Sequence, residues 1–164
     1  MSFKIENTQV QTSVNNSQYV NASPQVFVSA SDFGPQTYNF TSNPENIYFP
    51  QVTNGRYIFI TPNSYEFYPE ISGMYLVSWS FTYQLNSGSS TTMTANVTTN
   101  NNDFHFTFPV SNTIQQTSFS TVIACAGFAA EDLINFSMSA TETLTLNLIA
   151  NSVTIQWIGP LTIM

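Results

Sequence analysis

The sequence predicts an all-β fold, either an antiparallel sandwich or a jelly roll. Three observations predict it: apolar and polar residues alternate in short runs, polar turn residues separate the runs, and no segment has convincing apolar spacing of three and four. Strands that follow one another without intervening helices are typical of a two-sheet architecture. The chain has 164 residues, of which 42% are hydrophobic, so we expect one main domain with a substantial core.

The predicted strands begin after residue 24. A first strand at 25–30 precedes a turn and a loop that together extend from Gly34 to Pro44. The pair Asn54-Gly55 is a strong hairpin signal, and it predicts a hairpin between the second and third strands. The strands predicted after the first are 47–52, 56–61, 64–67, 73–85, 93–99, 104–108, 116–126, 133–139, 143–149 and 153–158.

The first 23 residues differ from the rest of the chain. They are rich in Asn, Gln, Ser and Thr and contain few large apolar side chains, so they cannot bury enough surface to fold alone. We expect an arm at 1–23 and a domain at 24–164. The arm is either disordered or an extended strand that orders by pairing with a sheet edge of a neighbouring subunit. The arm residues expected to connect subunits in the second case are Phe3, Ile5, Val10 and Val14.

The charge of the chain excludes several classes of partner. Lys4 and Arg56 are the only cations against nine carboxylates, which gives a formal net charge of −7. Binding to a phosphate backbone needs several Lys or Arg side chains, so nucleic acid is excluded, as is polybasic attraction to anionic lipid. No apolar run approaches the roughly 18 residues that span a bilayer, so no membrane insertion is expected.

The sequence offers little for catalysis, and we predict that the protein is not an enzyme. With one histidine, His105, and one cysteine, Cys125, neither a Ser-His-Asp arrangement nor a zinc site within one subunit is expected. His105 alternates with the phenylalanines around it and should face solvent or an interface. Cys125 lies in an apolar run and should be a small buried hydrophobe; the alternatives are a link to another chain or a reactive thiol.

We expect no cofactor, with calcium as the alternative. Carboxylates together with Asn carbonyls could hold calcium, although the spacing matches no dedicated calcium loop. Glu131 and Asp132 are adjacent and fall at a predicted turn. We expect them to cap backbone amides there.

One predicted strand carries an unusual row of large side chains. Tyr75, Val77, Trp79, Phe81 and Tyr83 share one face, and the other face is also apolar at its start. A strand apolar on both faces is usually central and covered twice, once by its own second sheet and once by another body. That second body could be another subunit. Gly73, which precedes the row, is expected to permit a tight turn.

The spacing around this row resembles the signature of the C1q/TNF-like superfamily. Phe49, Gly55, Ile60, Phe67, Gly73 and Tyr75 are separated by five, four, six, five and one residues, and Val77 and Trp79 continue the alternation. Phe49, Phe67, Gly73 and Tyr75 match the family pattern in type and position. Gly55 stands where the family has a polar residue, although Asn54 is adjacent, and Ile60, Val77 and Trp79 are apolar replacements.

The C-terminal third is also similar to the family. The segments 120–123, 131–134 and 151–155 resemble an apolar strand, a Gly-Asp-x-Ile turn and the closing strand. Glu131 stands where the family usually has Gly, so this turn departs from the pattern. The resemblance covers residues 25–164 and excludes the arm.

The resemblance implies a ten-stranded jelly roll that forms a compact homotrimer, with aromatic and aliphatic residues buried along the threefold axis. The candidates for the trimer core or interface are Tyr75, Val77, Trp79, Phe81, Tyr83 and Trp157. For each of them, the core of a single chain is the alternative.

Together these features predict a structural, self-assembling subunit of an extracellular surface layer or fibre, linked head to tail through its arm. The heads of bacterial spore-surface (exosporium) filaments and base-layer proteins are similar in fold type and in their shortage of Lys and Arg. The alternative is a receptor- or glycan-binding head of a phage or cell-surface fibre. In that case Tyr38, Tyr48 or Tyr68 would stack on sugars from loops.

Overall fold

The computed structural model describes residues 25–32, 34–55, 58–59 and 66–160. This part of the chain is almost entirely β, with twelve strands and one short 3-10 helix, and every strand pair is antiparallel. Two of the strands have only two residues each, which leaves ten of four or more. The elements are β1 (Gln25–Asp32), β2 (Gln36–Phe40), β3 (Glu45–Asn46), β4 (Gln51–Gly55), β5 (Ile58–Phe59), β6 (Glu66–Pro69), β7 (Gly73–Gly88), β8 (Thr92–Thr98), β9 (Asp103–Pro109), β10 (Gln115–Cys125), η1 (Phe128–Ala130), β11 (Ile134–Ala140) and β12 (Leu144–Gly159).

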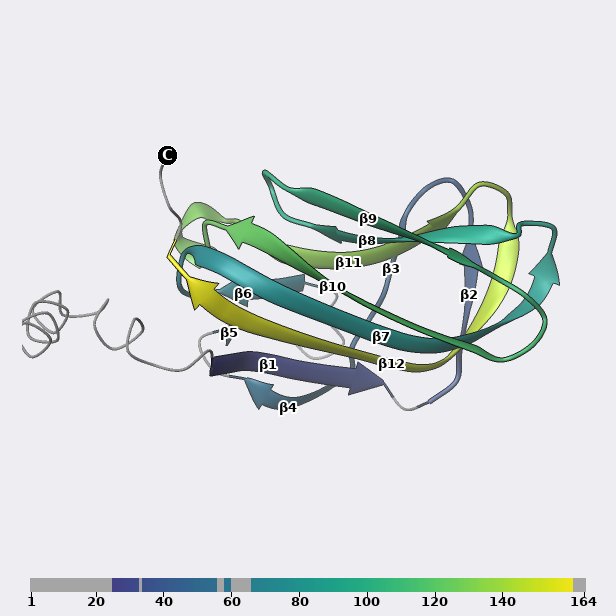
Figure 1. Ribbon diagram of the computed structural model, residues 1–164, viewed down its shortest axis with the longest axis horizontal. Coiled ribbons are helices and arrows are strands. Elements are labelled where there is room, and N and C mark those ends of the chain that lie inside the picture. Colours follow the sequence, from purple (N-terminus) through teal and green to yellow (C-terminus); the bar gives the residue numbers. More distant parts are fainter. Residues whose placement is uncertain (1–24, 33, 56–57, 60–65, 161–164) are drawn as a thin grey trace, which may run out of the picture.

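The strands form two six-stranded sheets. In the first, sheet A, the order is β10-β7-β12-β1-β4, and β2 also pairs with β12. In the second, sheet B, the order is β5-β6-β11-β8-β9, and β3 also pairs with β11. Figure 1 shows β8, β9 and β11 in one layer and β1, β4, β7, β10 and β12 in the other. This is the jelly-roll sandwich that the alternation of the sequence predicts.

The predicted strands 143–149 and 153–158 are one strand, β12, so the predicted break between them is wrong. β12 pairs with β7 along its length, and the register shifts between Leu148 and Ala150. Before the shift Leu146 and Leu148 are buried, and after it Asn151 and Val153 are buried. A β-bulge adds one residue and changes the phase of the alternation, which resembles a turn in the sequence.

Two predictions near the N-terminus are also wrong. The segment 36–40, predicted as loop, is β2, and it pairs with the start of β12. Its outward residues are polar and exposed, so it carries little apolar signal. The Asn54-Gly55 pair makes no hairpin, because β4 pairs with β1 in sheet A while β5 pairs with β6 in sheet B.

Aromatic side chains join the two sheets. Phe49, Phe67 and Phe136 pack edge to face with ring centroids 5.3–5.7 Å apart, and Trp79 of the facing sheet lies 5.1 Å from Phe136. Although residues 47–50 form no strand, Phe49 from this connection is fully buried. The core is therefore continuous between the sheets.

Gly73 is required for close packing and not for a turn conformation. Its φ is not positive, and a Cβ placed on it would lie 2.6 Å from the carbonyl oxygen of Gly159 and also overlap the Trp157 indole. Among the described residues other than glycine, Glu131 has the left-handed conformation, with φ 52°. The turn thus keeps a backbone conformation that favours Gly, although Glu occupies the position.

Candidate interaction surface

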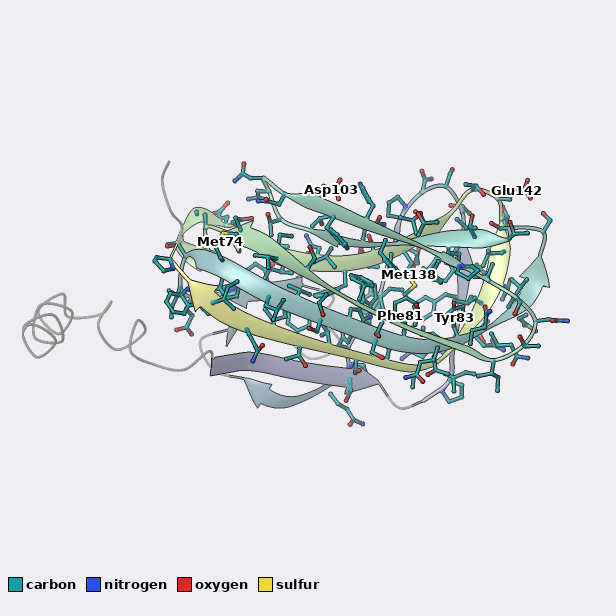
Figure 2. The ribbon with its side chains drawn as sticks, in the orientation of Figure 1. Met74, Phe81, Tyr83, Asp103, Met138 and Glu142 are labelled. Atoms are coloured by element: carbon teal, nitrogen blue, oxygen red, sulfur yellow. The ribbon has the colours of Figure 1, made fainter. Side chains whose placement is uncertain are left out.

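The large residues of β7 lie in the interior of a single chain. Tyr75, Val77, Trp79, Phe81 and Tyr83 are at most 1% exposed without any partner subunit, and Trp157 is 8% exposed. Figure 2 shows Phe81 and Tyr83 among the side chains between the layers. All six candidates therefore pack in the core of one chain. The four connector candidates, Phe3, Ile5, Val10 and Val14, lie outside the described residues.

The opposite face of β7 is covered by small hydroxyl side chains. Ser78 lies opposite Ser120 of β10 and Thr154 of β12, and their neighbours form a second row of three serines. The Oγ atoms of Ser78 and Ser120 are 2.8 Å apart. We call this set the serine floor; its members are Ser78, Ser80, Ser118, Ser120, Ser152 and Thr154. They line a shallow depression of about 430 Å³ on the outward face of sheet A.

One end of this face is apolar. Val122 lies opposite Leu76, and Val122 and Ile158 are 49% and 43% exposed. Met74 and Leu76 are half-buried beside them. A contiguous group of exposed apolar side chains that is rimmed by polar residues is typical of an interaction site.

The three long strands of this face carry no charge. β7, β10 and β12 contain no Asp, Glu, Lys, Arg or His. The whole chain has a net charge of −7, so two copies repel each other at most orientations. The outward face of sheet A is a surface where a second copy can approach without burying an unpaired carboxylate.

Three phenylalanines close one side of the sandwich, where the end strands of the two sheets meet. Phe106 of β9 stacks on Phe119 of β10 with centroids 4.7 Å apart, and Phe104 lies 5.6 Å from Phe119. All three are only partly buried. We call Phe104, Phe106 and Phe119 the phenylalanine edge.

Burial makes Cys125 and Tyr75 poor nucleophiles. Cys125 is buried, its thiol is directed at the Asp132 carbonyl, and burial raises the pKa of the thiol to about 12. Burial also raises the pKa of Tyr75, whose hydroxyl donates to the Ile71 carbonyl. Cys125 is thus the small buried hydrophobe that the sequence predicts.

Asp132 caps backbone amides, as predicted. Its carboxylate accepts hydrogen bonds from the amides of Asn100 at 2.8 Å and Ala126 at 2.6 Å. It therefore joins the turn after β8 to the end of β10. These bonds fix the turn in which Glu131 has its left-handed conformation.

The three tyrosines considered for sugar stacking do not all lie in loops. Tyr38 is in β2 and Tyr68 is in β6, both are half-buried, and their hydroxyls donate to Gln36 and Glu66. Tyr48 lies outside the strands and is 37% exposed. The structure does not single out these residues as a sugar platform.

Sequence reasoning missed the serine floor. The signal was present in β7, where Ser78 and Ser80 alternate with large residues, and in β10, where Ser118 and Ser120 repeat the pattern. What the sequence could not provide was the pairing that sets the two rows side by side. In β12 the bulge displaces Ser152 and Thr154 onto the same face.

No protein-family model matches the chain, and no curated protein matches it. Several solved structures, however, are similar to the chain in fold. The chain is similar to the PRD1 vertex protein P5, with a TM-score of 0.53 and 16% identity over 82% of this chain and 99% of that one. It is similar to the Eiger TNF from S. frugiperda, with a TM-score of 0.53 and 12% identity over 85% and 97%. Murine APRIL gives a TM-score of 0.52 and 12% identity over 80% and 98%.

These likenesses, with the sheet order, define the class of fold as a C1q/TNF-like jelly roll, as the sequence resemblance implies. Among the described residues no helix is long and apolar enough to cross a membrane.

Proposed function

We propose that the protein is a structural subunit that self-associates as a homotrimer and builds an extracellular surface layer or fibre. The observation that carries this proposal is the outward face of sheet A. It has three long strands without a charge, a floor of small hydroxyl side chains, and the exposed residues Val122 and Ile158.

The second copy offers a matching surface. The phenylalanine edge presents partly exposed rings, and the serine floor has side chains small enough to receive them. When the edge of one copy packs on the floor of the next, each copy uses two different surfaces, so the contact is heterologous. A heterologous contact closes into a ring when the rotation is a simple fraction of a turn. Three copies is the number that the family resemblance implies.

The composition supports a location outside the cell, on a spore or other surface. Only two Lys and Arg residues are present, so the chain has two trypsin-type cleavage sites. A polar surface with few charged residues, only 7% of the chain, suits a durable layer such as that of bacterial spores. In this proposal the arm at 1–23 links one trimer to the next by pairing with a free sheet edge.

The trimer is tested by light scattering at micromolar concentration. Thr154→Glu places a carboxylate on the serine floor and should weaken self-association at least tenfold, because the interface would bury an unpaired charge. Thr107→Glu is the matched control, since Thr107 is exposed on the outward face of sheet B. A solitary wild-type chain, or equal effects of both variants, contradicts the proposal.

The arm is tested separately. Deletion of residues 1–23 should leave soluble trimers and abolish the polymers seen by negative-stain electron microscopy. Polymers that survive the deletion contradict the role of the arm but leave the trimer intact. Discrete trimers that never polymerise and that bind a glycan array favour the receptor-binding alternative.

A further inference from the structure

A second depression lies on the outward face of sheet B, on the other side of the molecule from the serine floor. It has a volume of about 320 Å³ and is lined by side chains of β8, β9 and β11 together with Pro44. Among its lining residues the ionisable ones are Asp103 and His105, both on β9. Figure 2 shows Asp103 at the outer margin of sheet B.

A chain of hydrogen bonds fixes the ring of His105. Asn96 of β8 lies opposite His105 and is only 4% exposed. Its Nδ2 donates to Ser137 Oγ at 3.3 Å, and its Oδ1 lies 2.6 Å from His105 Nδ1. An amide oxygen can only accept a hydrogen bond, so Nδ1 of His105 carries the hydrogen. Asn96 thereby sets both the tautomer and the orientation of the imidazole.

The consequence appears at the other ring nitrogen. Nε2 of the neutral imidazole holds a lone pair, and it lies 3.1 Å from Asp103 Oδ2. Two acceptors at this distance repel each other unless a cation lies between them. That cation is either a proton on Nε2, which makes an ordinary ion pair, or a metal ion.

We propose that His105 Nε2 and Asp103 Oδ2 bind a divalent transition-metal ion, with water in its other coordination positions. If an ion lay about 2.05 Å from each atom, the angle at the ion between Nε2 and Oδ2 would be about 98°, given their 3.1 Å separation. This angle lies between the octahedral and tetrahedral values, so both atoms can bind one ion after small movements of exposed side chains. The side chains of His105 and Asp103 are 57% and 59% exposed.

Asn96 orients His105 in the way that neighbouring acceptors orient metal-binding histidines. A histidine that binds a metal through one nitrogen nearly always donates the hydrogen of the other nitrogen to a fixed acceptor. Asn96 Oδ1 is such an acceptor, and Asn96 is itself held by Ser137. Asn96 is thus a positioning residue, while His105 and Asp103 are the ligands.

The ligand set selects the class of ion. One imidazole nitrogen and one carboxylate oxygen suit zinc, copper or nickel, whereas calcium takes six to eight oxygens. In the part of the chain that the structure describes, no third His, Cys, Asp or Glu joins the pair. The site is therefore open to solvent and binds with modest affinity. With one His and one Cys, the chain is not expected to form a closed four-ligand zinc site, and the proposed site is of a different, open kind.

The experiment is a titration of the full chain with zinc chloride, followed by NMR of the single imidazole and by calorimetry. We expect one zinc ion per chain, with the largest shifts at His105. His105→Gln should abolish binding, and Asp103→Asn should weaken it at least tenfold. Glu142→Gln, which removes an exposed carboxylate elsewhere, should leave it unchanged. Calcium at equal concentration should not compete.

A second pair of variants tests the positioning role. Asn96→Leu should weaken zinc binding 10–100-fold and change the nitrogen chemical shifts that report the His105 tautomer. Asn96→Asp keeps an oxygen acceptor for the Nδ1 hydrogen of His105, so zinc binding and the tautomer shifts should stay close to those of the wild type. If Asn96→Leu does not fold, the exposed ligands His105 and Asp103 still decide the matter. Zinc binding that persists in His105→Gln, or an imidazole that stays unshifted at millimolar zinc, shows an ion pair only and overturns the proposal.

Discussion

The outward faces of the two sheets are built from the same kinds of residue, yet they differ in charge. Both alternate Ser, Thr and Asn with buried apolar side chains. The three long strands of sheet A have no charged residue, while β3, β6 and β9 of sheet B contain Glu45, Glu66 and Asp103. In a chain with a net charge of −7, this difference makes the long strands of sheet A the more favourable docking surface for a second copy in the proposed trimer.

The largest effect should come from the layer that both faces share. Trp79 is fully buried, packs on Phe49, Phe81 and Phe136, and donates to Asn151 at 2.6 Å. Trp79→Ala should lower the free energy of unfolding by about 3–5 kcal/mol, because it leaves a cavity in the core. Denaturant unfolding measures this loss. Thr107→Ala on the outward face of sheet B should change it by less than about 0.5 kcal/mol, and similar values for the two would contradict the burial of Trp79.

The next largest effect should be on self-association, and it should come from the outward face of sheet A. Val122→Asp should weaken self-association at least tenfold, since Val122 is exposed at the apolar end of the sheet A face. Ile114→Asp is the control, because Ile114 is 66% exposed and lies outside the strands. Sedimentation velocity over a range of concentrations measures both. Equal behaviour of the two variants would mean that exposed apolar residues anywhere on the surface, and not this face, promote association.

The shared layer should give stability a pH dependence in the alkaline range. Burial raises the pKa of Cys125 from 9.0 to about 12, so the folded state disfavours the thiolate. The resulting stability is complete below pH 9 and is lost as the pH rises from about 9 to 12, with a slope of at most about 1.4 kcal/mol per pH unit. Burial of Tyr75 acts in the same direction. Thermal midpoints across this range should fall less steeply in Cys125→Ala, and an unchanged slope would assign the loss to other groups.

The smallest effect tests the turn between the sheets. Glu131→Gly should raise the free energy of unfolding by about 0.5 kcal/mol, since removing the left-handed penalty outweighs the backbone entropy that Gly adds to the unfolded chain. Glu142→Gly, at an exposed turn position without a positive φ, should lower it. Thermal unfolding measures both changes. A loss of stability in Glu131→Gly would show that its side chain contributes more than its backbone costs.

The fold class and most strands could be predicted, because alternation along a strand is a local property. The turn at Asp132 and the buried Cys125 were likewise evident from their neighbours in sequence. The errors fall where local signals mislead: the polar strand β2, the bulge at Ile149 and the Asn54-Gly55 pair inside β4 and not between strands. Each of these depends on which strand lies alongside, which sequence periodicity does not record.

The sequence by itself determined that one face of β7 is aromatic, that the segments of β7, β10 and β12 contain no charged residue, and that a single histidine is present. Only the tertiary structure decided that the aromatic face is closed within one chain. It also decided that residues as distant as Ser78, Ser120 and Thr154 make one floor, and that Asn96 holds His105 beside Asp103. The physical reason is that a strand fixes which side chains share a face, while long-range pairing fixes which strands share a sheet and what covers each face.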